Sequence, residues 1–345
     1  MEKIRLAVIF GGMSSEHEVS CVSCASVLDN INSEKYEIIK IGITKDGRWL
    51  LTEADSEEIR KGKWSGKTAF LSPDRSIGAV VTEDGYIKVD CIFPAVHGRM
   101  CEDGVLQGLL ELSGIPYVGS GVSSSACSMD KSITKLIAKE EGIRQAEFVL
   151  VRRWELEDDM ENILFKVEKK LGEYPFFIKP AREGSSVGIS KAGDRKSLEQ
   201  GLLEAARFDD RILVEETVEG REIETAVLGN DKLIVGEIGE ILSCNEFYDY
   251  EAKYNDIGSE TRIADDIPQK LHAEIKEKAK RVFKALDCRG MARVDFFLTE
   301  DNEIILNEIN TLPGFTSISM YPKMMEAAGV SYSRLIDRLI ELAME

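Results

Sequence analysis

Short apolar runs alternate with amphipathic segments along the first 120 residues of the chain. Residues 6–10, 36–43 and 89–94 have the length and composition of buried strands, and 104–113 has the spacing of a helix. Strands that alternate with helices favour a sheet of parallel strands. We therefore predict an α/β fold in which residues 1–120 form an N-terminal domain built on a parallel sheet.

The middle of the chain repeats this pattern on a smaller scale. Helical spacing runs through 123–142 and 155–172, and strands are expected at 148–151 and 176–179. We predict that residues 121–218 form a second, smaller α/β domain.

The last third of the chain is richer in strands, and we predict a third domain at 219–345. After a strand at 213–216, which ends the second domain, strands are expected at 222–228, 233–238, 292–298 and 303–310, and helices at 273–286 and 331–343. Between 242 and 262 lies a long stretch with little periodicity and four aromatic residues. Loops of this length are usually functional or disordered, and the aromatic residues argue against disorder, so we predict a lid at 242–262.

The net charge of the chain makes some classes of binding partner unfavourable. The chain has 44 basic and 62 acidic residues, so its net charge is 44 − 62 = −18. Such a field repels nucleic acids and anionic membranes, and we expect neither as a partner. A polyanionic ligand such as a nucleotide would need local lysines, backbone amides or metal ions, which makes a divalent cation an expected cofactor.

Apolar runs and cysteines favour a cytoplasmic protein. The run at 6–10 is far shorter than the ~18 residues that a membrane helix needs, and no export signal is recognised. The seven cysteines are odd in number and scattered, which is typical of reduced thiols. Cys21 and Cys24 form a C-x-x-C pair without a second pair, which favours packing at a helix start over zinc binding.

Acidic side chains alternate with apolar ones in the two strands expected around a turn at 299–302. If Leu298 lies opposite Glu303, Asp295 and Glu308 become diagonal neighbours on one face, and Asn310 follows on that face. Two carboxylates and an amide oxygen suit Mg²⁺. A solvated strand face is the alternative, and a one-residue slip in register would move Asp295 to the other face.

Two glycine-bearing turns could hold charged ligands. Lys179 ends a predicted strand, and the small residues 184–186 follow, so the ammonium and backbone amides could bind phosphate; a simple turn is the alternative. The loop does not end as a P-loop does. Near the N-terminus, Gly11 and Gly12 precede Glu16, whose charge fits an ammonium group better than a phosphate.

Six motifs in order along the chain resemble the D-alanine:D-alanine ligases of the ATP-grasp superfamily. They are Gly11-Gly12 with 16–20, His97-Gly98 with 102–104, 117–121 with 129–131, Lys179-Pro180 with 184–188, 247–250 with 253–254, and 307–311 with Pro313-Gly314. The resemblance covers essentially the whole chain. It implies three α/β domains with ATP between the central and C-terminal ones. It also implies ligation of two D-alanines through an acyl phosphate, for peptidoglycan precursor synthesis.

The resemblance also implies roles for residues that bind metal and ATP. Asp295, Glu308 and Asn310 would hold two Mg²⁺, or Mn²⁺, with Glu308 bridging them. The residues expected at ATP are Lys131, Lys179 and Ser186 at the phosphates, Lys253 at the transferring phosphoryl group, Glu222 at the ribose, and Glu215, Glu216 and Val218 at the adenine.

Roles at the amino acid substrates follow from the same resemblance. Glu16 would bind the ammonium of the first D-alanine, Arg293 and the amide of Gly314 the oxyanion, and Ser319 and Met320 the second D-alanine, with His97 nearby. Ser185 and Tyr254 would join Glu16 in a hydrogen-bonded link that closes the lid. We also expect a homodimer.

One loop departs from the family pattern. The family usually has small residues between His97-Gly98 and Glu102, where this chain has Arg99-Met100-Cys101. The departure suggests Cys101 as an exposed thiol and bears on the second substrate, for which D-serine and D-lactate are alternatives to D-alanine. Tyr254 and the apolar Met320 favour D-alanine. A non-catalytic nucleotide-binding regulator is a further alternative, but the metal ligands and phosphate lysines of an enzyme are all present.

Overall fold

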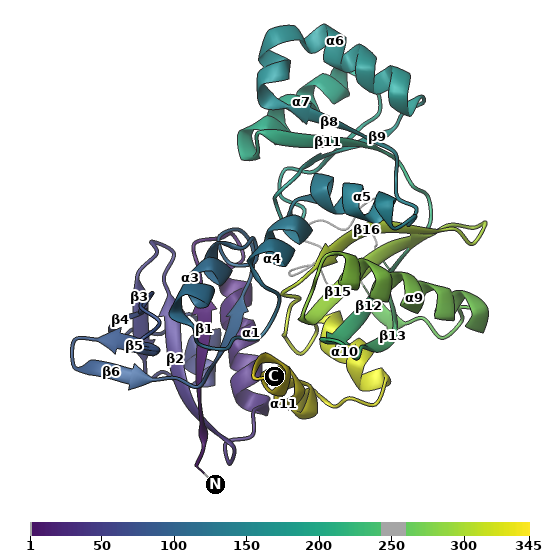
Figure 1. Ribbon diagram of the computed structural model, residues 1–345. Coiled ribbons are helices and arrows are strands. Elements are labelled where there is room, and N and C mark those ends of the chain that lie inside the picture. The colour runs from purple at the N-terminus through teal and green to yellow at the C-terminus, as the bar shows by residue number, and fades with distance from the viewer. Residues whose placement is uncertain (1, 243–259) are drawn as a thin grey trace.

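The computed structural model describes residues 2–242 and 260–345, and its strands form three sheets (Figure 1). Most of the segment predicted to be a lid therefore lies outside the described residues; its two ends are the last residue of one strand and the first residues of another. None of the helices in this described part of the chain combines the length and the apolar composition of a transmembrane helix.

The N-terminal sheet has seven strands in the order β6-β5-β4-β3-β2-β1-β7. Their bounds are β1 Ile4–Gly11, β2 Tyr36–Ile43, β3 Trp49–Thr52, β4 Lys67–Leu71, β5 Ala79–Thr82, β6 Gly85–Lys88 and β7 Cys91–Val96, and the helices are α1 His17–Asn30, α2 Ser56–Arg60 and α3 Val105–Ser113. β1 pairs in parallel with β2 and β7, whereas β2 to β6 pair antiparallel. The prediction of a parallel sheet is thus correct for three strands and wrong for the antiparallel extension.

Two helices precede the central sheet where the sequence predicts one. α4 spans Val122–Met129 and α5 spans Lys131–Glu140. The helical conformation is interrupted at Asp130, which has extended backbone angles. Its side chain caps α5 by accepting hydrogen bonds from the amides of Ser132 and Ile133. The cap fixes the position of Lys131, the first residue of α5.

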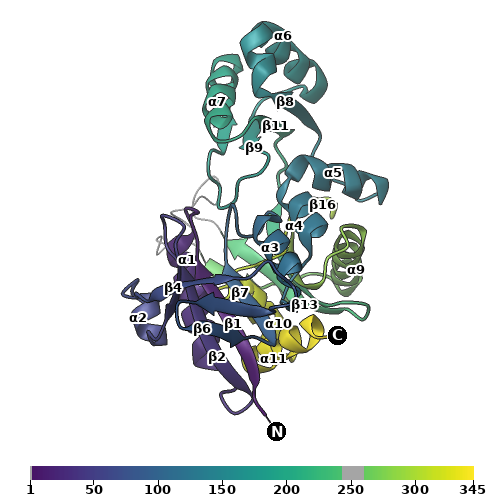
Figure 2. The same ribbon diagram turned by 60° about the vertical axis from the view of Figure 1, so that its left-hand side comes forward.

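The central sheet is small, antiparallel and has its own core. Its order is β10-β9-β11-β8, with β8 Phe148–Arg152, β9 Phe176–Pro180, β10 Ser190–Ala192 and β11 Arg211–Glu216. The helices α6 Arg153–Leu171 and α7 Arg195–Phe208 pack against it through fully buried side chains such as Val167 and Leu202. Figures 1 and 2 show this unit standing away from the rest of the molecule.

The third sheet contains the two strands of the hairpin predicted at 292–310, which carry Asp295 and Glu308 and are called the acidic strands. Its order is β14-β13-β12-β15-β16, with β12 Arg221–Gly229, β13 Ile234–Leu242, β14 Glu260–Ile263, β15 Gly290–Leu298 and β16 Ile304–Asn310. The helices are α9 Gln269–Ala285, α10 Met320–Ala327 and α11 Tyr332–Ala343. α9 packs on this sheet, whereas α11 also contacts α1 and β7 of the N-terminal part.

The register of the hairpin β15–β16 differs from the predicted one. Leu298 pairs with Ile304 rather than with Glu303, and a bulge between Asp295 and Phe296 brings Asp295 directly opposite Glu308. The two carboxylates are therefore direct neighbours and not diagonal ones. A bulge places an extra residue in one strand and re-aims the side chains beside it, which an alternating pattern cannot reveal.

Candidate active site

A cavity of about 820 Å³ is lined by residues from the loops and edges of all three sheets. Its walls contain every predicted site residue within the described part of the chain: Glu16, His97, Lys131, Lys179, Ser185, Ser186, Glu215, Glu216, Val218, Glu222, Arg293, Asp295, Glu308, Asn310, Gly314, Ser319 and Met320. The other two, Lys253 and Tyr254, lie outside the described residues.

Three acidic side chains occupy neighbouring strands in one wall of this cavity. Glu224 of β12 pairs with Asp295 of β15, which pairs with Glu308 of β16. Opposed like charges destabilise a sheet unless they are neutralised. Arg293 donates to both oxygens of Asp295, at 2.8 and 2.7 Å, and its Nε lies 2.7 Å from Glu224 Oε2. Although burial lowers the pKa of Arg293, these acids hold it well above its ordinary value, so the guanidinium remains charged.

The oxygen atoms of this wall fit a magnesium ion. Asp295, Glu308 and Asn310 all line the cavity from adjacent strands. Arg293 uses one acceptor position on each oxygen of Asp295, and a carboxylate offers about four such positions. The described residues contain no group of three or more His, Cys, Asp and Glu side chains placed to hold a metal ion. The third oxygen of the predicted set would come from the side-chain amide of Asn310, which lines the same cavity. A small, all-oxygen set of this kind suits Mg²⁺.

Lys179 lies between the central and third sheets. Its Nζ is 2.7 Å from Glu215 Oε2 and donates to Asn307 Oδ1 at 3.4 Å. Burial would lower the pKa of Lys179, but Glu215 and Glu308 raise it more, so the lysine is charged. Burial likewise raises the pKa of Glu215, yet Lys179 and Lys135 bring it down to about 2. Glu215 thus holds a lysine at the cavity through its side chain.

Lys131 reaches the same wall from α5. Its Nζ donates to the backbone carbonyl of Glu183 at 2.8 Å and lies 3.4 Å from Glu308 Oε2. Two lysines from different elements therefore lie close to the acidic strands, which gives the cavity positive charge for phosphate oxygens.

The loop after β9 closes over Glu16, the residue before α1. Ser185 Oγ donates a hydrogen bond to Glu16 Oε1, which joins two of the three residues of the predicted link. Ser185 and Ser186 have φ of 48° and 61°, in the left-handed region that non-glycine residues rarely adopt. Gly98 faces the other side of the same carboxylate, where a Cβ would lie 2.8 Å from Glu16 Oε2.

His97 is buried and uncharged beside this carboxylate. Its Nδ1 lies 3.1 Å from the carbonyl oxygen of Leu312, which can only accept, so Nδ1 carries the proton. Nε2 then accepts from Ser23 Oγ at 2.8 Å. Burial lowers the pKa of His97 despite the nearby charge of Glu16. The ring thereby links α1 to the loop after β16.

The N-terminus of α10 also lines the cavity. Ser319 precedes the helix and Met320 begins it. Gly314 passes so close to Ser319 that a Cβ would lie 2.8 Å from its Oγ, so a side chain at Gly314 would force this hydroxyl to move. A helix N-terminus beside a hydroxyl and a small residue favours a carboxylate or an oxyanion.

Comparisons with known proteins identify the family. The family model described as D-ala D-ala ligase N-terminus matches residues 5–120, and the one described as D-ala D-ala ligase C-terminus matches residues 137–341. The chain belongs to the D-Ala-D-Ala ligase family. A relative named D-alanine--D-alanine ligase from Caldicellulosiruptor bescii is 51% identical over 100% of this chain and 96% of its own length. Another of that name from Clostridium acetobutylicum is 49% identical over 99% of this chain and 98% of its own.

Solved structures of D-Ala-D-Ala ligases and of a related ligase share the fold. The VanG D-Ala:D-Ser ligase from Enterococcus faecalis matches with a TM-score of 0.90 and 40% identity, over 99% of this chain and 100% of that one. The D-alanine-D-alanine ligase from Coxiella burnetii matches with a TM-score of 0.85 and 35% identity, over 99% and 95%. The ATP-grasp fold predicted from the resemblance is thereby confirmed.

Several residues of this site were given no role from the sequence. Glu224 pairs with Arg293, and Lys135 pairs with Glu215 Oε1 at 3.0 Å. Glu102 is buried in the cavity wall, and its Oε2 has no hydrogen-bond partner among the described residues. Burial, with Glu16 nearby, raises the pKa of Glu102 well above its ordinary value. Glu224 lies two residues after the predicted Glu222. Because alternate residues of a strand point to the same face, this spacing could have indicated Glu224 from the sequence.

Of the two predictions about cysteines, the structure contradicts one and agrees with the other. Cys101 was expected to be an exposed thiol, but it is 3% exposed, so that expectation is wrong. Packing beside Gly12 encloses it, since a Cβ on Gly12 would lie 2.8 Å from its Sγ. Burial, with Glu102 and Asp103 adding to it, raises the pKa of Cys101 to about 12. Cys21 and Cys24 are buried in α1 with free thiols, as expected of packing residues.

Proposed function

We propose that this chain ligates two molecules of D-alanine to D-alanyl-D-alanine with hydrolysis of ATP to ADP and phosphate. The observation that carries the proposal is that one cavity unites Glu16, the acidic strands with their lysines, and the N-terminus of α10. These three parts match an ammonium group, a nucleotide triphosphate and a carboxylate. The full-length relatives with the D-alanine--D-alanine ligase name support this choice of substrates.

In the first step, a carboxylate oxygen of the first D-alanine attacks the γ-phosphorus of ATP, and ADP leaves. Glu16 binds the ammonium of that substrate, while Lys131 and Lys179 bind phosphate oxygens. Asp295, Glu308 and Asn310 would hold magnesium, which would neutralise phosphoryl oxygens as charge moves to ADP. The charges of these residues are in place before the reaction, so little reorganisation is needed.

In the second step, the amine of the second D-alanine attacks the carbonyl carbon of the acyl phosphate. The carbonyl oxygen becomes an oxyanion, which Arg293 and the amide of Gly314 stabilise. Phosphate then leaves, and the amine loses its extra proton to give the peptide bond. Ser319 and the N-terminus of α10 bind the carboxylate of the second substrate, and Met320 contacts its side chain.

D-Serine is the second candidate for this position, because the VanG structure that matches this chain is that of a D-Ala:D-Ser ligase. Met320 is apolar and 6% exposed, which favours the methyl group of D-alanine. An apolar pocket rejects an added hydroxyl by only about 10²-fold, so we expect weak activity with D-serine.

Further parts of the proposal concern assembly and metal content. We propose two Mg²⁺ ions, with Glu308 between them and Mn²⁺ as a substitute, and a homodimer in the cytoplasm. We also propose domain boundaries near 120 and 218. In support of them, each position lies between the last strand of one sheet and the first strand of the next along the chain. Tyr254 remains the proposed third member of the link with Glu16 and Ser185.

Phosphate release tests the function. The protein is incubated with ATP, Mg²⁺ and D-alanine alone or with D-serine or D-lactate, and the product is identified by mass. We expect one phosphate for each D-alanyl-D-alanine formed. Phosphate release without any dipeptide or depsipeptide would contradict the proposal.

A further inference from the structure

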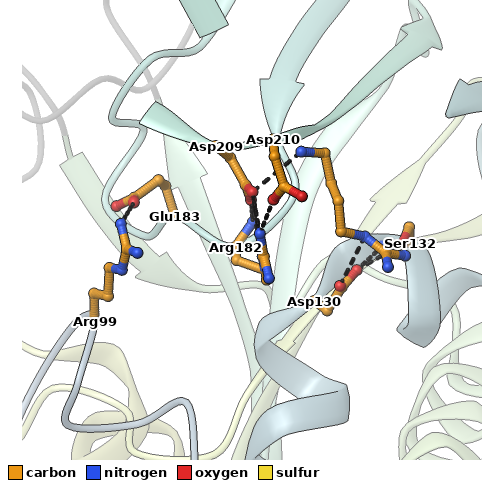
Figure 3. A network of polar contacts seen from close by, with 8 residues as sticks. Arg99, Asp130, Ser132, Arg182, Glu183, Asp209 and Asp210 are labelled. Carbon is orange, nitrogen blue, oxygen red and sulfur yellow. Dashed lines mark hydrogen bonds and ion pairs between the residues drawn. The ribbon is translucent and has the colours of Figure 1, made fainter. Parts of the chain in front are cut away.

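An ion pair connects two loops that follow strands of different sheets (Figure 3). Arg99 follows β7 of the N-terminal sheet, and Glu183 follows β9 of the central sheet. Arg99 Nη1 lies 3.4 Å from Glu183 Oε1. The side chain of Arg99 is 62% exposed, whereas that of Glu183 is 16% exposed and lines the cavity.

Glu183 also holds a phosphate lysine through its backbone. Its carbonyl oxygen accepts a hydrogen bond from Lys131 Nζ at 2.8 Å, and the same Nζ lies 3.4 Å from Glu308 Oε2. A continuous set of polar contacts therefore runs from Arg99 to the acidic strand. Movement of Glu183 would displace the lysine.

The base of the 181–189 loop is firmly attached. The amide of Arg182 donates to Asp209 Oδ2 at 2.9 Å, and its guanidinium contacts Asp209 and Asp210. Nearby, Arg211 Nε lies 3.1 Å from Asp130 Oδ2 at the start of α5. These contacts lie within the central part of the chain, so they fix the base but not the position of the tip.

The tip of the loop depends on contacts with the N-terminal part. Ser185 and Ser186 both have left-handed backbone angles, each of which is costly for a residue with a Cβ. The bond from Ser185 to Glu16 compensates for part of that cost. Arg99–Glu183 is a second contact between the same loop and the same part of the molecule.

We propose that Arg99 and Glu183 are positioning residues, whose ion pair holds the 181–189 loop against the first-substrate pocket and couples occupancy of that pocket to the placement of Lys131. The inference rests on the proposed function, because it takes the ligand of Glu16 to be D-alanine and that of Lys131 to be ATP. Neither residue of the pair needs to touch the reacting atoms.

Ligand binding measures this coupling without turnover. The affinity for a non-hydrolysable ATP analogue with Mg²⁺ is measured in the absence and presence of D-alanine, in the wild type, Arg99→Gln, Glu183→Gln and the double variant. We expect each single variant to reduce the D-alanine-dependent gain in affinity two- to fivefold, or about 0.4–1 kcal/mol. The double variant should lose no more than either single one, because one interaction is lost in all three.

Two further variants sharpen the test. Arg99→Lys should retain part of the coupling, since it keeps the charge. The matched control is the exposed pair Lys67–Asp84 in the N-terminal sheet, at 2.6 Å, where Lys67→Gln should leave the coupling unchanged.

Two outcomes would overturn the role of the ion pair: additive losses in the double variant, or coupling in the single variants equal to that of the wild type. A separate assay of the wild type for dipeptide tests the proposed function, so the two failures are distinguishable.

Discussion

Individual acidic residues in this protein differ in charge because their neighbours differ. Glu215 lies between Lys179 and Lys135 and remains ionised, with a pKa of about 2. Glu102 is buried without such a partner, and its pKa is raised. Two neighbouring lysines thus keep the Glu215 carboxylate ionised, whereas burial favours the protonated form of Glu102 in the same cavity.

Glu308 is the carboxylate on which the metal proposal depends most. Glu308→Gln removes a negative charge beside Asp295, so we expect Mg²⁺-dependent turnover to fall by at least 100-fold while the protein stays folded. Phosphate release and thermal unfolding measure the two effects. Glu300→Gln, in the exposed turn of the same hairpin, is the matched control. Normal turnover in Glu308→Gln would contradict its assignment as a metal ligand.

His97 should make stability depend on pH. Burial depresses its pKa in the folded protein, so between that value and the unfolded pKa of about 6.5 only the unfolded chain binds the proton. Stability contributed by neutral His97 is therefore full above about pH 6.5 and falls as the pH drops below it, by at most about 1.4 kcal/mol per pH unit.

Urea unfolding of the wild type and His97→Gln between pH 5 and 8 tests this dependence. The wild type should lose stability faster than the variant as the pH falls, because the variant has no imidazole to protonate. The other two histidines, His17 and His272, are present in both proteins and cancel in the comparison. Parallel curves would contradict the expectation.

At the scale of elements, helix α5 places a phosphate lysine by way of its cap. Asp130 accepts from the amide of Ser132 at 3.0 Å and pairs with Arg211. Asp130→Ala removes both contacts, so we expect a loss of about 1–2 kcal/mol in the free energy of unfolding and a higher KM for ATP. Asp130→Asn retains the cap and should lose less stability. Urea unfolding and initial rates at varied ATP measure these effects; an unchanged KM for ATP in Asp130→Ala would contradict the positioning of Lys131 by its cap.

Elements with strong hydrophobic patterns were predictable from the sequence, and weakly patterned ones were not. The buried strand β2 has the bounds that were expected, and β1 and β9 are each longer by a residue or more. β3 to β6 were missed because they are short and partly exposed at the edge of the sheet, where no continuous apolar run is required.

The same limit explains the site. The resemblance supplied residues that share one cavity, including Glu16 and Asn310 from opposite ends of the chain. It could not supply the bulge at Asp295, because a bulge depends on pairing between strands. Nor could it supply the ion pair of Arg99 with Glu183, which are 84 residues apart and come together only in the folded protein.

At the scale of the whole molecule, the two ends of the chain share one hydrophobic core. Fully buried residues of β1, such as Phe10, belong to the same cluster as Tyr321 of α10 and Leu339 of α11. Figures 1 and 2 both show α11 beside the N-terminal part. The central sheet, by contrast, has a separate core.

A polar contact reinforces this junction. Asp337 of α11 is 7% exposed and accepts from Tyr36 Oη at 2.9 Å and from Lys35 Nζ at 2.6 Å. Asp337→Ala leaves the buried hydroxyl of Tyr36 without an acceptor, so we expect a loss of about 1–3 kcal/mol in the free energy of unfolding. Asp337→Asn should lose less, since an amide oxygen can still accept. Urea denaturation checks both; equal stability in all three proteins would contradict the role of this contact.

The shared core also affects how the protein is made. β1 and its neighbouring helix α1 are synthesised long before α10 and α11, which share the hydrophobic core of the N-terminal sheet. Until then the side chains that α10 and α11 cover in the folded protein lack these partners, whereas the core of the central sheet comes entirely from 149–214 and does not depend on them. The core of the central sheet can therefore form before the contacts between the N-terminal sheet and α11.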